Sequence, residues 1–193
     1  LLAFRSAGVP STIVIDERSS GFVAIGWMRA SGLAAALVST SGSAPFHYGP
    51  AVAEADASSL PLLVLSADRP ERLRSCGSMQ TSLQAKMLPE LFRSSVDLPA
   101  PVDGTESLAS CERALASLGG AYPGPVSVNV QFEEPLWDAS SDQVLADGHC
   151  KQQASLTRGA YQLTDVLPEH FFDVGRRGLI SVGPPADGLL SFD

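Results

Sequence analysis

The sequence has little cysteine, no long apolar run and no secretion signal. Its three cysteines (Cys76, Cys111 and Cys150) lack the spacing of a metal site, and they are typical of idle thiols in a reducing compartment. No apolar run approaches the ~20 residues that a membrane span requires. The first residues lack the charged start, apolar middle and cleavage site of a signal peptide. These absences predict a cytoplasmic protein.

Basic residues are also scarce, with 13 Lys and Arg against 21 Asp and Glu, which gives a net charge of −8. This balance excludes nucleic acid as a partner, because its phosphates demand basic surface. The chain contains neither a G-x-G-x-x-G fingerprint nor the lysine of a Walker phosphate loop. Hydrophobic residues make up 45% of the 193 residues, which is enough to bury a globular core. A small-molecule ligand is therefore expected.

Short apolar runs alternate with helical patterns along the chain. The runs are continuous rather than alternating, as in strands covered on both faces, and they lie at residues 12–15, 35–38, 62–65, 126–130 and 179–182. Helical spacing occurs at residues 17–30, 45–57 and 105–118. In the first of these, Phe22, Ile25 and Met28 share one face, and Gly32 suits a C-terminal cap. The order predicts an α/β fold: a parallel sheet flanked by helices, with right-handed crossovers.

The composition changes after Trp137, and this change predicts the domain organisation. We expect residues 1–138 to form the α/β domain, residues 139–175 a polar linker, and residues 176–193 the truncated start of the next domain. Because the chain has no initiator Met, we expect it to begin inside a longer protein.

Ligands of parallel α/β sheets gather where strands end and helices begin, and unusual residues mark three such edges. At the first, Asp16 and Glu17 follow the apolar run 12–15. Taken alone, this pair of acidic residues has a simple structural explanation. Asp16 would cap the following helix, and Glu17 would interact favourably with the helix dipole. At the second, residues 39–44 are small enough for a flat ligand to approach their backbone, although a plain tight turn explains them better.

The third edge, residues 66–80, carries three arginines in an otherwise acidic chain. Arginines recognise carboxylates through bidentate pairs. For Arg72 and Arg74 we favour the simpler interpretation of a solvated charged loop. Arg69 lies closest to the end of the preceding apolar run and is the best candidate for binding a ligand.

In this order, the motifs resemble the N-terminal domain of the 2-succinyl-5-enolpyruvyl-6-hydroxy-3-cyclohexene-1-carboxylate (SEPHCHC) synthases. These are thiamine-diphosphate (ThDP) enzymes of menaquinone biosynthesis. The resemblance covers about residues 1–138, and the last apolar run resembles the start of the family's central domain. The matching motifs are Asp16-Glu17-Arg18-Ser19, Thr40-Ser41-Gly42, Pro50-Ala51-Val52-x-Glu54-Ala55, Ala67-Asp68-Arg69-Pro70, Cys76-Gly77-x-x-Gln80 and Phe132-x-Glu134-Pro135-Leu136.

The resemblance implies that ThDP supplies the difficult chemistry. Glu17 would be the catalytic glutamate that hydrogen-bonds N1′ of the aminopyrimidine ring and so promotes removal of the C2 proton. Thr40, Ser41 and Gly42 would line the pyrimidine. The family decarboxylates 2-oxoglutarate and adds the resulting succinyl-semialdehyde carbanion to isochorismate, giving SEPHCHC.

Both of these substrates are dicarboxylates, so the resemblance gives Arg69 and Gln80 the task of fixing anionic groups. It also implies a homo-oligomer, a dimer or tetramer, with the cofactor held between subunits. The diphosphate and Mg2+ would bind in a pyrophosphate domain outside this chain, so the fragment alone is expected to be inactive. The family's Pro-Gly-Ser-Arg loop and first strand would precede Leu1, and Met79 stands where the family usually has asparagine.

Two alternatives remain at this stage. One is another ThDP-dependent carboligase or decarboxylase, similar to acetohydroxyacid synthase, which would share the glutamate. In that class we would not expect Asp68-Arg69-Pro70 together with Gln80. The other is a non-catalytic α/β module retained for subunit assembly.

Overall fold

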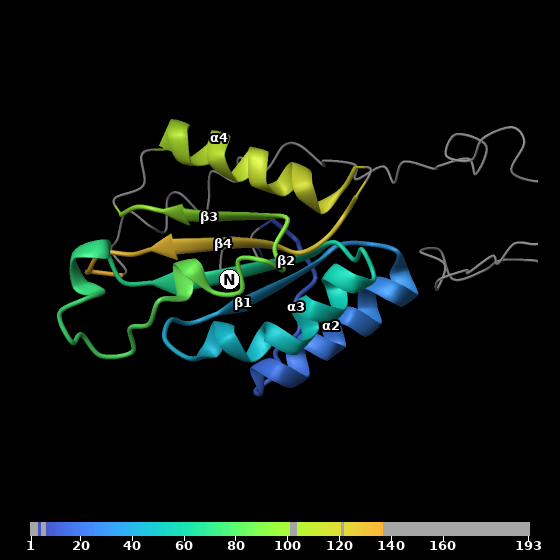
Figure 1. The fold of residues 1–193 in the computed structure, drawn as a ribbon, viewed down its shortest axis with the longest axis horizontal. Coiled ribbons are helices and arrows are strands. Elements are labelled where there is room, and N and C mark those ends of the chain that lie inside the picture. Colours follow the sequence, from blue (N-terminus) through green and yellow to red (C-terminus); the bar gives the residue numbers. More distant parts are fainter. Residues whose placement is uncertain (1–3, 5–6, 101–103, 121, 137–193) are drawn as a thin grey trace, which may run out of the picture.

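The structure is a computed structural model that describes residues 4, 7–100, 104–120 and 122–136 (Figure 1). Its centre is a four-stranded sheet with the order β1-β2-β4-β3, and each neighbouring pair is parallel. The strands are β1 (Ala35–Ser39), β2 (Leu62–Asp68), β3 (Ser94–Leu98) and β4 (Val126–Gln131). The predicted fold class, a parallel sheet flanked by helices, is confirmed.

Helices cover both faces of this sheet. Figure 1 shows α2 (Glu17–Ser31) and α3 (Gly49–Ala57) on one face and α4 (Gly104–Leu115) on the other. The three predicted helices are confirmed, although a 3-10 turn (Ala44–Tyr48) precedes α3 and another (Ala116–Leu118) follows α4. Gly32 ends α2 as predicted, because its left-handed backbone (φ 69°) lets its N–H bond to the Met28 carbonyl.

Two apolar clusters form the core, one on each face of the sheet. In β2, Leu62 and Val64 belong to the cluster under α2 and α3, whereas Leu63 and Leu65 pack against the cluster under α4. Successive side chains of a strand point to opposite faces, so a strand with helices on both sides is apolar at consecutive positions where it packs against both cores. Burial on both faces therefore explains the continuous apolar run at residues 62–65.

The predicted strand at residues 12–15 is wrong. These residues form no strand, and their side chains Ile13 and Ile15 are 94% and 96% exposed. A strand needs a neighbour for its backbone hydrogen bonds, and in the described part of the chain nothing pairs with this run or with the outer edge of β1. Residues 12–15 are apolar enough for a strand, but without a partner strand in the described residues they do not form one.

Two further expectations are corrected by the structure. Phe22 is 50% exposed and does not share the buried face of Ile25 and Met28. Strand β3 was not predicted, because Ser94, Ser95 and Asp97 interrupt its apolar pattern. The predicted linker and the last apolar run, residues 179–182, lie outside the described residues. Within the described ranges, no helix is both long and apolar enough to cross a membrane.

The exposed apolar run and the open edge of β1 lead to a prediction about the polypeptide of residues 1–193. Exposed apolar side chains and unpaired strand edges promote association. We expect this polypeptide to self-associate at micromolar concentration, and Ile13→Lys with Ile15→Lys to reduce the association. Ser11→Lys with Thr12→Lys adds the same charge at exposed polar neighbours and serves as control. Size-exclusion chromatography with light scattering measures the mass, and a monomer before any substitution would contradict the prediction.

Candidate functional site

The three loops singled out in the sequence lie at the same edge of the sheet. Strands β1, β2 and β4 are parallel and in register, with Ser39 opposite Ser66 and Asp68 opposite Gln131. Their carboxyl ends therefore meet at one edge, toward which the arrowheads point in Figure 1. Parallel α/β sheets bind ligands at this edge.

The turn after β1, formed by Thr40, Ser41 and Gly42, contacts both predicted substrate-binding residues. The Gln80 side-chain amide donates from Nε2 to Thr40 Oγ1 at 2.9 Å and to the Ser41 carbonyl at 3.1 Å. Arg69 Nη1 donates to Ser41 Oγ at 3.4 Å. Five of the six predicted site residues are thus brought together by the fold.

Gly42 and Gln80 are fitted closely to each other. Gly42 has φ +87°, and a Cβ there would lie 2.9 Å from Gln80 Cγ. Gln80 itself has φ 57°, a left-handed conformation that is uncommon and unfavourable for a residue other than glycine. Its two side-chain hydrogen bonds hold it there. Backbone strain of this kind is concentrated at binding sites, where the surrounding contacts fix it.

The sixth predicted residue, Glu17, lies in the first turn of α2. The capping role belongs to its neighbour Asp16, whose side chain accepts a hydrogen bond from the Ser19 N–H at 2.7 Å. Hydrogen bonds from Ser19 lower the pKa of Asp16. The Asp16 cap is therefore confirmed, and the Glu17 carboxylate is not needed to satisfy the helix N-terminus.

Tyr48 connects Glu17 with the turn after β1. Tyr48 is 2% exposed, and burial raises the pKa of its hydroxyl, with a smaller contribution from the negative charge of Glu17. Tyr48 also packs against the first turns of α2, since a Cβ on Gly21, four residues after Glu17, would lie 3.8 Å from Tyr48 Cδ1. Tyr48 ends the 3-10 turn that begins at Ala44, two residues after Gly42. Glu17 therefore lies at the same end of the sheet as the turn of residues 40–42.

Ser39, the last residue of β1, has a buried hydroxyl. It lies near the Tyr48 hydroxyl but makes no hydrogen bond of good geometry within the described residues. A buried hydroxyl without a partner costs about 1–3 kcal/mol. Because this oxygen has almost no accessible surface, the Tyr48 hydroxyl beside it is the available partner rather than a ligand. The groups left for a ligand at this end of the sheet are the Glu17 carboxylate and the small residues of the turn 40–42.

A buried polar network underlies the site, and the sequence interpretation of Arg74 as a solvated loop residue is wrong. The Arg74 side chain is 11% exposed and forms ion pairs with Asp68 at 2.8 Å and Asp97 at 2.6 Å. The hydrogen bond to Asp97 raises the pKa of Arg74. Asp68 has no exposed side-chain surface, and a buried carboxylate needs a cation. Arg72, by contrast, is exposed as predicted and pairs with Glu133 at the surface.

Asn129 is the centre of this network. Its Nδ2 donates to Asp68 and Asp97, each at 2.8 Å, while its Oδ1 accepts from Ser66 at 2.8 Å. Sequence analysis missed these residues as site components. A signal was present, because polar side chains interrupt the apolar strand runs, at Ser66 and Asp68 of β2 and at Asn129 of β4.

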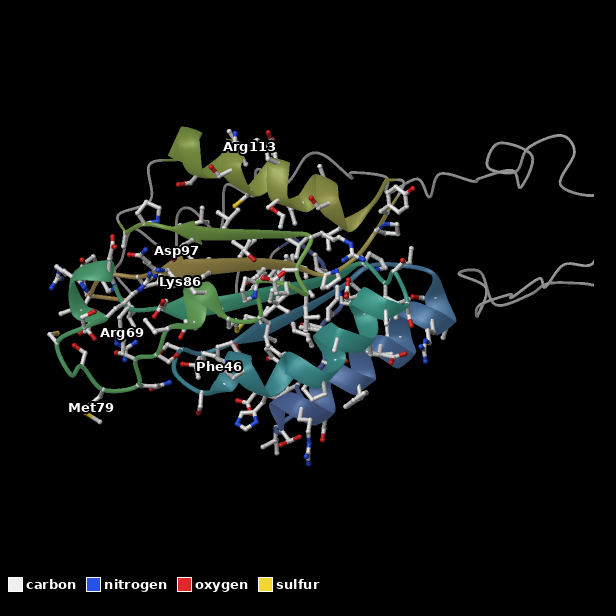
Figure 2. All side chains as sticks on the ribbon, viewed as in Figure 1. Phe46, Arg69, Met79, Lys86, Asp97 and Arg113 are labelled. Carbon is white, nitrogen blue, oxygen red and sulfur yellow. The ribbon has the colours of Figure 1, made fainter. Side chains whose placement is uncertain are left out.

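The buried network also fixes the backbone position of Arg69. Asp68 Oδ1 accepts from the Arg69 backbone N–H at 2.7 Å, which fixes the corner where the chain leaves β2. Among the residues that the structure describes, the Arg69 guanidinium makes only the long hydrogen bond to Ser41 Oγ, which leaves most of its donors for an anion. Figure 2 shows Arg69 on the inner side of the following loop, whereas Met79 at its tip points away. Met79 is 87% exposed and does not enter the cluster.

The fold and the residues at this edge define a class of protein. Residues 1–88 match the family described as "Thiamine pyrophosphate enzyme, N-terminal TPP binding domain", TPP being another name for ThDP. The chain therefore carries the N-terminal domain of a thiamine pyrophosphate enzyme.

Within this class, the relatives of the chain are SEPHCHC synthases. It is 41% identical to the synthase of Chlorobium phaeobacteroides (strain BS1) over 158 residues, which are 80% of this chain and 26% of that protein. It is 47% identical to the synthase of Kineococcus radiotolerans over 136 residues, which are 66% of this chain and 24% of that protein. The predicted resemblance to the N-terminal domain of SEPHCHC synthases is confirmed. The chain spans about a quarter of the length of these relatives.

Proposed function

We propose that this chain is the pyrimidine-binding domain of a SEPHCHC synthase in menaquinone biosynthesis. The enzyme would release CO2 from 2-oxoglutarate and join the remaining four-carbon unit to isochorismate. One observation carries the proposal: Arg69 and Gln80 both donate to the turn of residues 40–42, at the end of the sheet where Glu17 begins α2. A candidate proton-relay carboxylate and two candidate anion-binding side chains thus share one edge.

The residues present fit the aminopyrimidine half of ThDP. When bound, ThDP supplies the carbon centre at which 2-oxo acids lose CO2. Glu17 would hold a proton shared with N1′ of the ring. The turn of residues 40–42 would line the ring, and Gly42, which lacks a Cβ, leaves room for Gln80 to pack against the turn.

The diphosphate and its Mg2+ are assigned by this proposal to another domain. Within the described residues, no group of three or more His, Cys, Asp or Glu side chains could hold a metal. We also propose, from the change of composition after Trp137, that residues 1–138 form the pyrimidine domain, 139–175 a linker and 176–193 the start of a central domain. The cofactor would lie between subunits of a cytoplasmic homo-oligomer, a dimer or tetramer, and residues 1–193 alone would be inactive.

The test uses the full-length enzyme, by which we mean a protein of the relatives' length that carries this chain. With ThDP and Mg2+, we expect one CO2 released from 2-oxoglutarate for each isochorismate consumed. A preference for pyruvate over 2-oxoglutarate would favour an enzyme similar to acetohydroxyacid synthase. Failure to bind ThDP would favour a non-catalytic assembly module.

Arg69 gives a prediction about substrate binding. If its guanidinium fixes a substrate carboxylate, Arg69→Ala should lower kcat/KM by about 2 kcal/mol, roughly 30-fold, mainly through KM. Arg72→Ala is the matched control, because Arg72 lies three residues further along the chain, is exposed and is paired with Glu133. Steady-state kinetics with 2-oxoglutarate and isochorismate measure both variants. If both substitutions changed kcat/KM by an equally small factor, Arg69 would be a solvated loop residue that does not bind substrate.

A further inference from the structure

Gln84 is a buried glutamine that contacts three segments of the candidate site. It begins a 3-10 turn (Gln84–Lys86) and is 1% exposed. Its Oε1 accepts from the Gly42 N–H at 2.9 Å. Its Nε2 donates to the Ala67 carbonyl and to Asn129 Oδ1, each at 2.8 Å. One side-chain amide therefore joins the turn after β1, the end of β2 and the middle of the buried network.

The same segment holds Gly42 from its other side. Ser82 Oγ donates to the Gly42 carbonyl at 2.8 Å, so both backbone polar groups of Gly42 are bound by residues 82–84. Glycine is the most flexible residue, and a left-handed glycine in a turn keeps its conformation only where contacts fix it. The turn of residues 40–42 receives these contacts from a segment forty residues away in the sequence.

Gln84 also connects the turn to the Arg69 corner. Asn129, which accepts from Gln84, donates to Asp68, and Asp68 accepts from the Arg69 backbone N–H. The continuous chain of hydrogen bonds runs from Gly42 to Arg69 through buried groups, where such bonds are stronger than at the surface. A change at either end therefore alters the geometry of the other.

We propose that Gln84 is a positioning residue: it fixes the Gly42 turn in the conformation that receives the cofactor ring and sets its distance from the Arg69 corner. The proposal rests on the proposed function for the identity of the ligand. Gln84 does not itself touch the ligand. It acts by holding Gly42, with Ser82 as its partner.

The first experiment measures the position of Gly42 without any cofactor. In Gln84→Met, a substitution that keeps the side-chain volume but removes its polar atoms, exchange of the Gly42 amide hydrogen in the full-length enzyme should accelerate about tenfold. This is the expected effect of losing one buried hydrogen bond. Gln131→Met is the matched control, because Gln131 is a 5% exposed glutamine that accepts from the Glu71 N–H and does not contact the turn.

The second experiment measures cofactor binding in the same proteins. We expect the Kd for ThDP, from calorimetry with Mg2+ present, to rise about tenfold in Gln84→Met and to stay unchanged in Gln131→Met. At saturating ThDP, kcat should return to within about threefold of the unsubstituted enzyme, because the turn is misplaced but the reacting groups are intact. Ser82→Ala, which creates no large cavity, should change exchange and Kd in the same direction by a smaller factor.

Each outcome decides the question. Equal weakening of ThDP binding in Gln84→Met and Gln131→Met would reveal general loosening and overturn the positioning role. Unchanged Gly42 exchange in Gln84→Met, or in Ser82→Ala if Gln84→Met does not fold, would overturn it as well. If the unsubstituted enzyme did not bind ThDP, the proposed function would fail, while the exchange measurement would still decide whether Gln84 holds the turn.

Discussion

Glu17→Gln is expected to slow exchange of the C2 proton of bound ThDP by about two to four orders of magnitude, the range of a lost general acid–base group. An amide cannot hold the shared proton at N1′ that the carboxylate is proposed to hold. The fold should be retained, because Asp16 rather than Glu17 accepts the capping hydrogen bond of α2. Binding of ThDP should change little, since glutamine keeps the volume of glutamate.

The neighbouring carboxylate provides the control. Asp16→Asn makes the same carboxylate-to-amide change one residue earlier, and asparagine caps helices as well as aspartate does. In the full-length enzyme loaded with ThDP and Mg2+, quenched-flow transfer into D2O followed by NMR of the C2 proton gives the exchange rate. Asp16→Asn should exchange at the unsubstituted rate. Equally fast exchange in Glu17→Gln would falsify the assignment of Glu17.

The sequence predicted most of the fold because burial on both faces leaves a local signature. The runs at residues 35–38 and 62–65 are apolar without interruption, the run of β4 is apolar at every second position, and the helical spacing between the runs is regular. The two failures that concern strands have one physical cause. Whether residues 12–15 pair, or whether Ser94–Leu98 joins an edge, depends on a neighbouring strand that local pattern does not reveal.

The sequence could predict those residues of the candidate site that stand directly after a strand. Thr40, Ser41, Gly42 and Arg69 stand directly after β1 and β2, and the fold brings them together with Gln80. The supporting residues were not predictable in this way. Gln84 stands in a loop with no periodicity, and its three partners come from segments 17 to 45 residues away. Contacts over such separations are set by tertiary packing.

Arg74 shows the same limit, and it leads to the largest expected effect on stability. Among the charged residues 68–74 it resembles its exposed neighbour Arg72 in sequence, yet it is bonded to two carboxylates and nearly buried. Arg74→Leu would leave the fully buried Asp68 without its cation. Removing one partner of a buried ion pair destabilises a protein by about 3–5 kcal/mol. Arg72→Leu removes an exposed pair, and it should change stability by about 0–1 kcal/mol.

Urea unfolding of residues 1–193 measures both variants, with Ile13→Lys and Ile15→Lys present in every protein to limit association. Adding Asp68→Asn to Arg74→Leu should recover part of the loss, since the uncompensated charge is then absent. If Arg74→Leu and Arg72→Leu had the same free energy of unfolding, the buried ion pairs of Arg74 would stabilise the protein no more than the surface pair of Arg72 does.

The loss caused by Arg74→Leu should also depend on pH through Asp97. Burial would raise the pKa of the Asp97 carboxyl, but hydrogen bonds from Arg74 and Asn129 and the Arg74 charge outweigh burial and lower the pKa below its ordinary value of 3.8. A group whose pKa is lower in the folded state contributes stability above its unfolded pKa, and that contribution disappears as the pH falls through the folded value. The difference between the unsubstituted protein and Arg74→Leu should therefore be constant near neutral pH and shrink below pH 3.8. A difference that stayed constant down to the acid unfolding limit would show that Arg74 acts through packing of its stem rather than through its charge.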